Sequence, residues 1–234
     1  LSNKAFLWLV SAALFGLINQ GLTFALSNYQ LAFLWQLKHM EMLYYALLLF
    51  GTVIVAFFIV PPLSARLGKK NGAILLALLS LSFNTALYAS WLLDLVPGGP
   101  TDPSVAYMFS FLIFSNSTAI GMMMLTSSMM ADVVEASQQE TGRRSEGLFF
   151  AGYFFMQKCA VGIGTFAAGM ILSFAQFPQN AKPGQVDAAV LDGLALYYMV
   201  VVLVLGIIGV LILRHFPISR ESHNERLRAL NTSA

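Results

Sequence analysis

The apolar run YYMVVVLVLGIIGVLIL, residues 197–213, decides the class of this protein. It contains no charged side chain, and with the residues upstream to about 190 it is long enough to cross a hydrocarbon core of about 30 Å as a helix. Similar runs recur along the whole chain, which is 58% hydrophobic and only 10% charged, with a mean hydropathy of +0.73. A soluble domain carries roughly 25% charged residues, so we expect an integral membrane protein.

Six such runs predict an all-α transmembrane domain at residues 1–214, followed by a cytoplasmic tail at 215–234. The spans are expected at about 5–30, 40–63, 72–93, 105–131, 147–174 and 190–213. Helices are favoured because each satisfies its own backbone hydrogen bonds where no water is available. Proline marks the breaks, with Pro61 and Pro62 closing the second run.

The distribution of charge predicts the orientation. If the amino terminus lies on side one, that side also receives the carboxy terminus and the connections after the second and fourth spans. Most of the cations fall there, namely Lys4, Arg66, Lys69, Lys70, Arg143, Arg144, Arg214, Arg220, Arg226 and Arg228, whereas Lys38 and Lys182 fall on the other side. By the positive-inside rule, both termini are cytoplasmic, in a multi-pass protein of the cell membrane, the inner membrane of a bacterium.

Several function classes are disfavoured. A net charge of +2, scattered along the chain, is too weak for a nucleic-acid surface. The motifs His-Glu-x-x-His, Gly-x-Ser-x-Gly and the P-loop are absent, and Cys159 stands in an apolar helix without a histidine nearby in sequence. We therefore expect no catalytic residues, no metal site, no cofactor and no nucleic-acid partner.

Lys158 is the one cation expected at mid-depth in a span. An ionisable residue there costs several kcal/mol and usually faces a partner or a water-filled cavity. The functional interpretation is a cation in a substrate or ion pathway. The alternative is a lysine that is neutralised by desolvation or paired with a carbonyl.

Neutral polar side chains gather at similar depth and suit a polyhydroxylated solute, because they both donate and accept hydrogen bonds. The candidate contacts are Asn19, Gln20, Asn116, Tyr153 and Gln157. Interhelical hydrogen bonding is the alternative for each of them. In the fifth span, Ala160, Gly164 and Ala168 recur at every fourth position and predict close helix packing rather than binding.

The segment ADVVEASQQETGRRSEGLFF, residues 131–150, is expected to be a cytoplasmic loop. Asp132 and Glu135 with Arg143 and Arg144 are candidates for a cytoplasmic gate, because charge-assisted pairs can hold helix ends together in one state and release them in another. An ordinary solvated loop is the alternative.

Residues 131–164, ADVVEASQQETGRRSEGLFFAGYFFMQKCAVGIG, resemble the loop 10–11 and helix 11 signature of the glycoside–pentoside–hexuronide:cation symporters, the melibiose-permease branch of the major facilitator superfamily. The segments SARLGKK (64–70) and NKAFLWLV (3–10) are also similar to that family's second half. The resemblance covers nearly all of the chain, as helices 7–12 of a twelve-helix transporter. It implies that Lys158, twelve residues beyond Glu146, lies at the cavity between the two halves.

The resemblance implies the carboxy-terminal half of a secondary active transporter, moving a sugar or glycoside with Na⁺ or H⁺ by alternating access. Such a half contains a 3+3 inverted repeat and is completed by an amino-terminal six-helix half. That half is expected to hold most of the coupling-ion site, since the family's carboxylates lie in helices 2 and 4 and we expect no Asp or Glu inside a span here. Membrane lipid is the remaining partner.

Two features of the sequence leave alternatives open. Ala136 and Ser137 stand where family members often have an aromatic residue and an acid, which leaves the substrate subgroup open. Leu1 leads almost directly into a span, which suggests an upstream portion. A lysolipid carrier of the same branch, or a half-size homodimeric or scaffold protein, are the other hypotheses.

Overall fold

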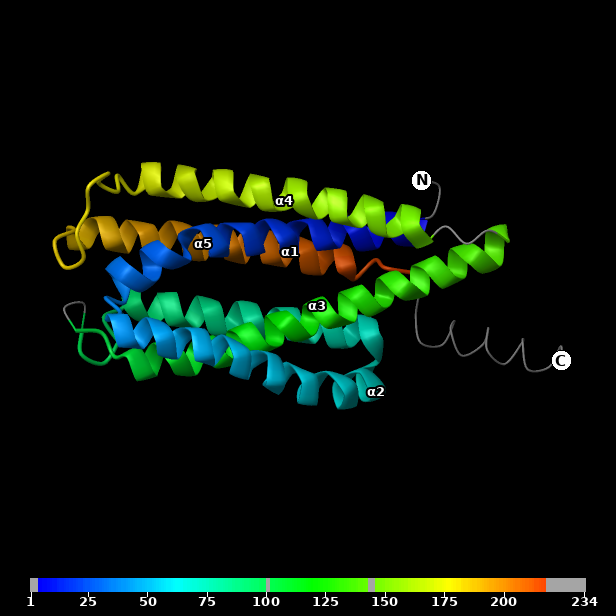
Figure 1. The fold of residues 1–234 in the computed structure, drawn as a ribbon, viewed down its shortest axis with the longest axis horizontal. Coiled ribbons are helices and arrows are strands. Elements are labelled where there is room, and N and C mark those ends of the chain that lie inside the picture. The colour runs from blue at the N-terminus through cyan, green and yellow to red at the C-terminus, as the bar shows by residue number, and fades with distance from the viewer. Residues whose placement is uncertain (1–3, 100–101, 143–145, 218–234) are drawn as a thin grey trace.

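The described residues of a computed structural model, 4–99, 102–142 and 146–217, form an all-helical bundle without strands (Figure 1). The elements are α1 (Lys4–Tyr29), the π-helical η1 (Gln30–Leu34), α2 (His39–Leu92), α3 (Val105–Thr141), α4 (Glu146–Phe174) and α5 (Ala188–Leu213). Five of these helices are long and apolar enough to cross a membrane. The expected class, an all-α membrane protein, is confirmed. Most of the predicted tail, residues 218–234, lies outside the described residues.

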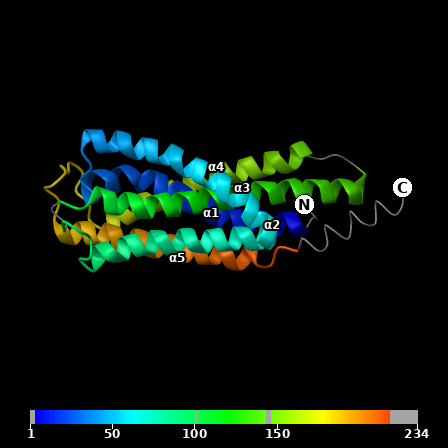
Figure 2. The same cartoon turned by 90° about the horizontal axis from the view of Figure 1, so that it is seen from below.

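Helix α2 contains both the second and the third predicted spans. Its 54 residues would reach about 80 Å if straight, but the helix breaks at Gly68, where φ is 77° and ψ is 164°. The chain reverses direction there, and α3 lies between the two limbs (Figure 2). The expectation that Pro61 and Pro62 end the second run is wrong, because the helix continues through both. The positive φ, which glycine adopts readily, makes the reversal.

Helix α3 is longer than the sequence predicted. It continues past the expected end at about 131 to Thr141, so Asp132 and Glu135 lie in a helix and not in a loop. Its end comes at Gly142, whose φ is 66° and whose N–H donates to the carbonyl oxygen of Gln138. The expected end near residue 131 was based on hydropathy, which marks the edge of the membrane and not the end of the helix. The helix instead ends at Gly142, the first glycine that follows Gly121 in the sequence.

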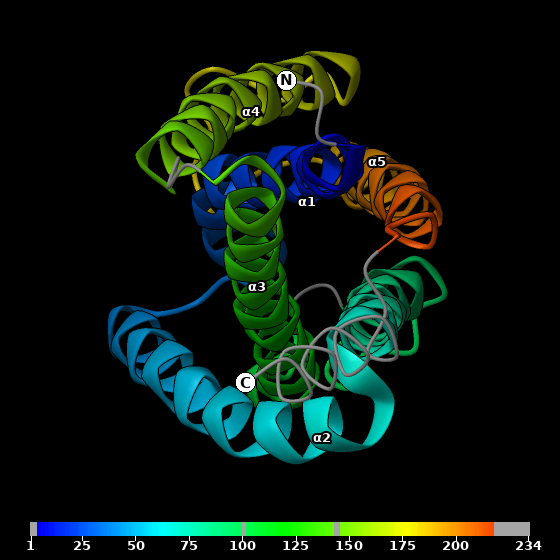
Figure 3. The same ribbon diagram turned by 90° about the vertical axis from the view of Figure 1, so that its right-hand side faces the viewer.

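The helices form two groups (Figures 1 and 3). Helix α1 packs between α4 and α5, while α2 packs against α3 and α5. The start of α1, the reversal at Gly68, the end of α3, the start of α4 and the end of α5 share one end of the bundle (Figure 1). The cations that the positive-inside argument grouped on side one, where the structure describes them, therefore share this end.

Candidate functional site

Lys158 lies on the exposed face of α4. The opposite face is buried against the rest of the bundle and carries Tyr153, Ala160 and Gly164. Within the part of the chain that the structure describes, Lys158 makes no hydrogen bond or ion pair. A structural partner for this ammonium is therefore not found among the described residues.

Tyr153 and Gln157 lie one turn apart on α4, on a different face from Lys158. Tyr153 is buried in the core cluster that also contains residues of α1, and Gln157 is half-buried. Tyr153 therefore lies on the buried face of α4, whereas Lys158 lies on its exposed face.

Asn19 and Gln20 are adjacent in sequence but differ in environment. Asn19 Nδ2 donates to the carbonyl oxygen of Val202 on α5 at 3.0 Å. One turn further, the hydroxyls of Thr23 and Tyr198 are 3.0 Å apart and hydrogen-bonded. These contacts join α1 to α5, and solute contact by Asn19 stays a prediction. Gln20 is exposed and has no described partner.

Asn116 belongs to the other group of helices. It is half-buried on α3, and its neighbour Ser115 exchanges hydrogen bonds with Ser80, of 3.0 and 3.2 Å, that join α3 to the second limb of α2. Among the predicted pathway residues, Gln20, Tyr153, Gln157 and Lys158 lie on the two helices α1 and α4, which pack against each other, whereas Asn116 lies on α3.

Close helix packing was predicted from the small residues of the fifth span, and it is confirmed, with α1 as the helix that α4 contacts. A Cβ built on Gly164 would collide with the carbonyl oxygen of Ile18 and with the backbone N of Leu22. Ala160, Gly164 and Ala168 are all buried. Backbone-to-backbone contact at this distance requires residues without bulky side chains.

The charged contacts at the end of the bundle differ from those expected. Asp132 accepts from Lys69 Nζ through both oxygens, at 2.6 and 2.7 Å. The adjacent Lys70 donates to the carbonyl oxygen of Phe216 at 2.7 Å. Lys69 and Lys70 were missed as gate candidates, although the segment SARLGKK contains them. Glu135 is exposed, and Arg143 and Arg144 lie outside the described residues.

Asp192 contradicts the expectation that no acid lies inside a span. It stands in α5, near the start of the helix, and its Oδ1 accepts a hydrogen bond of 3.0 Å from Trp91 Nε1. The predicted span at 190–213 already contains this residue, so the sequence analysis overlooked it. This hydrogen bond joins the start of α5 to the end of α2.

A bundle of long apolar helices is the architecture of a multi-pass membrane protein. A family profile described as MFS/sugar transport protein matches residues 1–220. The chain therefore belongs to this family of multi-pass membrane transporters, and the resemblance to a sugar symporter of the major facilitator superfamily is confirmed.

One curated relative carries the comparison further. The chain is 29% identical over 230 residues to an uncharacterized symporter of Synechocystis sp. (strain ATCC 27184 / PCC 6803 / Kazusa). The alignment covers 96% of this chain and 40% of the relative, so the chain spans less than half of that protein's length. No solved structure matches the chain.

Proposed function

We propose that this chain forms the carboxy-terminal six-helix half of a secondary active transporter that moves a sugar or glycoside with Na⁺ or H⁺. The family description supports the solute class, and the relative's name supports symport. The reversal of α2 at Gly68 supports six crossings, with each limb of α2 as one span. The coverage of only 40% of the relative supports a six-helix partner half.

The exposed Lys158, which has no partner among the described residues, carries the proposal. An ammonium at mid-depth that faced lipid would cost several kcal/mol. A partner half that covers this face of α4 removes that cost and places Lys158 at the boundary between the halves, where transporters of this architecture bind their solutes. Lys158 would then compete with the coupling cation for carboxylates of the partner half, while Gln20 and Gln157 contact the solute.

The contacts at the charged end support movement of this half as a unit. Lys69 joins the second limb of α2 to α3, and Lys70 joins it to the residues after α5. Rocking of the two halves against each other would give alternating access. Glu135, Arg143 and Arg144 remain candidates for the gate that forms and breaks during this motion. The end that carries these cations would face the cytoplasm.

The test is uptake by the intact protein in bacterial membrane vesicles, with methyl glucosides and methyl galactosides and with imposed Na⁺ or H⁺ gradients. Lys158→Ala is expected to abolish accumulation or its ion dependence. Lys182→Ala, which removes an exposed cation from the α4–α5 connection, is the matched control and should leave uptake unchanged. Unchanged, ion-dependent uptake by Lys158→Ala would show that the assigned role is wrong.

A second candidate is a carrier of lysolipids, favoured by the exposed aromatic residues beside Lys158. Phe154 and Phe155 are 55% and 73% exposed, and they could contact an acyl chain while the ammonium binds an acidic head group. The same vesicles with a labelled lysophospholipid distinguish the two. A half-size homodimer is tested by cross-linking, since it would give a product of twice this chain's mass.

A further inference from the structure

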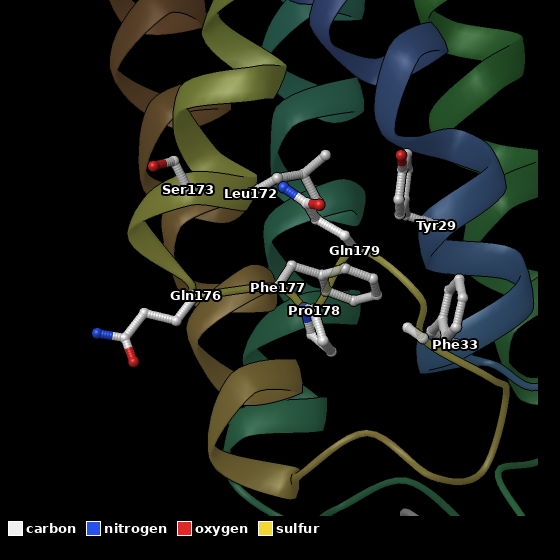
Figure 4. A pocket seen from close by; sticks show the side chains of 9 residues that line it. Tyr29, Phe33, Leu172, Ser173, Gln176, Phe177, Pro178 and Gln179 are labelled. Carbon is white, nitrogen blue, oxygen red and sulfur yellow. The ribbon is translucent and has the colours of Figure 1, made fainter.

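A cavity of about 600 Å³ lies at the end of the bundle opposite the amino terminus (Figure 4). It is formed by the end of α1 with η1, the last turn of α4 and the segment after it. Lys158 lies fourteen residues before Leu172 on α4, so the cavity is about 20 Å along the helix from it. This cavity is therefore separate from the proposed pathway residues.

Three aromatic rings from two distant segments form one wall of the cavity. Phe177 stands edge-on to Tyr29, with ring centroids 5.4 Å apart, and edge-on to Phe33 at 5.0 Å. Tyr29 and Phe33 are themselves nearly parallel at 6.2 Å. Each ring is thus held by the other two in the geometries that aromatic pairs prefer.

The turn after α4 brings Phe177 to this position. The backbone N–H of Phe177 donates to the carbonyl oxygen of Leu172 at 2.9 Å. Gln176 adopts a left-handed φ of 55° in this turn, which is uncommon for a residue other than glycine. The chain therefore turns back toward α1 and does not continue along the axis of α4.

The free polar groups at the cavity are neutral. The amide of Gln179 lies between Leu172 and Tyr29, whereas the side chains of Gln176 and Ser173 point away (Figure 4). Neither Gln179 nor the Tyr29 hydroxyl hydrogen-bonds with another described residue. None of the lining side chains is charged.

This lining has a definite chemical preference. Flat aromatic surfaces suit the C–H face of a ring, and an amide with a phenolic hydroxyl can donate to and accept from its hydroxyl groups. An ion or an acidic head group would find no opposite charge among these side chains. A cavity of this size lies within the range of small-molecule sites, about 300–1,000 Å³.

We propose that this cavity is a docking subsite at the outer mouth of the transporter for a neutral, hydroxylated ring such as a sugar. The inference rests on the proposed function for the solute class and adds a second position at which the solute binds. Tyr29, Phe33 and Phe177 form the stacking wall, and Gln179 supplies the orienting amide. The subsite raises the local concentration of solute before it enters between the halves.

The test compares concentration dependence of uptake among variants of the intact protein, with the methyl glycoside that the wild type transports. Gln179→Ala is expected to raise the apparent KM about three- to ten-fold with the maximal rate within two-fold, as loss of one hydrogen bond to a neutral group predicts. Tyr29→Phe should act in the same direction. Gln176→Ala, whose side chain points away, is the matched control and should keep the wild-type KM.

A second measurement locates binding directly. On a Cys159→Ser background, Gln179→Cys should react with a membrane-impermeant maleimide, and the methyl glycoside should slow the reaction, whereas Gln176→Cys should be labelled at the same rate with or without it. If the wild type transports the glycoside, two results would each overturn the subsite alone. One is an unchanged KM in Gln179→Ala and Tyr29→Phe, and the other is a lack of protection of Gln179→Cys by the glycoside. Failure of the wild type to transport any neutral glycoside would overturn the proposed function, and the subsite with it.

Discussion

Gly21 of α1 lies directly against Val161 of α4, so closely that a Cβ on the glycine would be 2.6 Å from the valine carbonyl oxygen and 2.8 Å from its Cα. Gly164 makes the reciprocal approach from α4 to the backbone of α1. The two helices that carry Gln20, Gln157 and Lys158 are therefore fixed relative to each other by backbone contact.

Larger side chains at this contact between α1 and α4 are expected to destabilise the bundle. Gly164→Val should lower the stability by at least about 1–3 kcal/mol, because the colliding atoms are backbone and cannot rotate away. Gly162→Val is the matched control, since a Cβ there meets nothing within 4 Å. Thermal midpoints of the purified protein in detergent give the comparison, and equal midpoints for the two variants would contradict the predicted packing.

The ion pair between Lys69 and Asp132 should contribute modestly. The side chains are 38% and 19% exposed, and partly exposed pairs are worth about 0.2–1 kcal/mol because water screens them. A double-mutant cycle with Lys69→Ala and Asp132→Ala should give a coupling energy in this range, reduced at high salt. Arg66→Ala is the control, because this exposed cation in the same segment has no described partner. Additive effects of the two substitutions would argue against the pair.

Asn19 and Gln20 are expected to separate stability from transport. Asn19→Ala removes the hydrogen bond to the Val202 carbonyl and should lower stability by about 0.6 kcal/mol, the average for an interhelical hydrogen bond in a membrane. Gln20→Ala removes no described contact and should leave the thermal midpoint unchanged while raising the KM for solute. If Asn19→Ala changed only the KM and Gln20→Ala changed only the thermal midpoint, both assignments would be wrong.

The orientation predicts opposite labelling of two positions. On a Cys159→Ser background, Asp102→Cys should react with an impermeant maleimide in intact cells, because it lies at the end opposite the amino terminus. Glu135→Cys should react only after the cells are permeabilised. Labelling of Glu135→Cys in intact cells would invert the proposed topology.

The class of protein could be predicted from local sequence. Burial in lipid requires apolar residues along a whole helix, so runs such as 197–213 identify a membrane segment without knowledge of its neighbours. Close helix packing could also be predicted from local sequence. Ala160, Gly164 and Ala168 are four residues apart, and residues at this spacing lie on the same face of a helix. The assignment of Lys158 to an exposed face needed the structure.

Helix ends and side-chain partners were decided only by the tertiary structure. Proline placed the end of one span at Pro61 and Pro62, and hydropathy placed the end of another near 131. The helices continue to Gly68 and Thr141, where backbone conformation stops them. Asp132 finds its partner in Lys69, 63 positions away in sequence. The aromatic wall likewise joins Tyr29 to Phe177. A hydropathy pattern is the same for every rotation of a helix about its axis, so pairing is determined only when the helices pack and set that rotation.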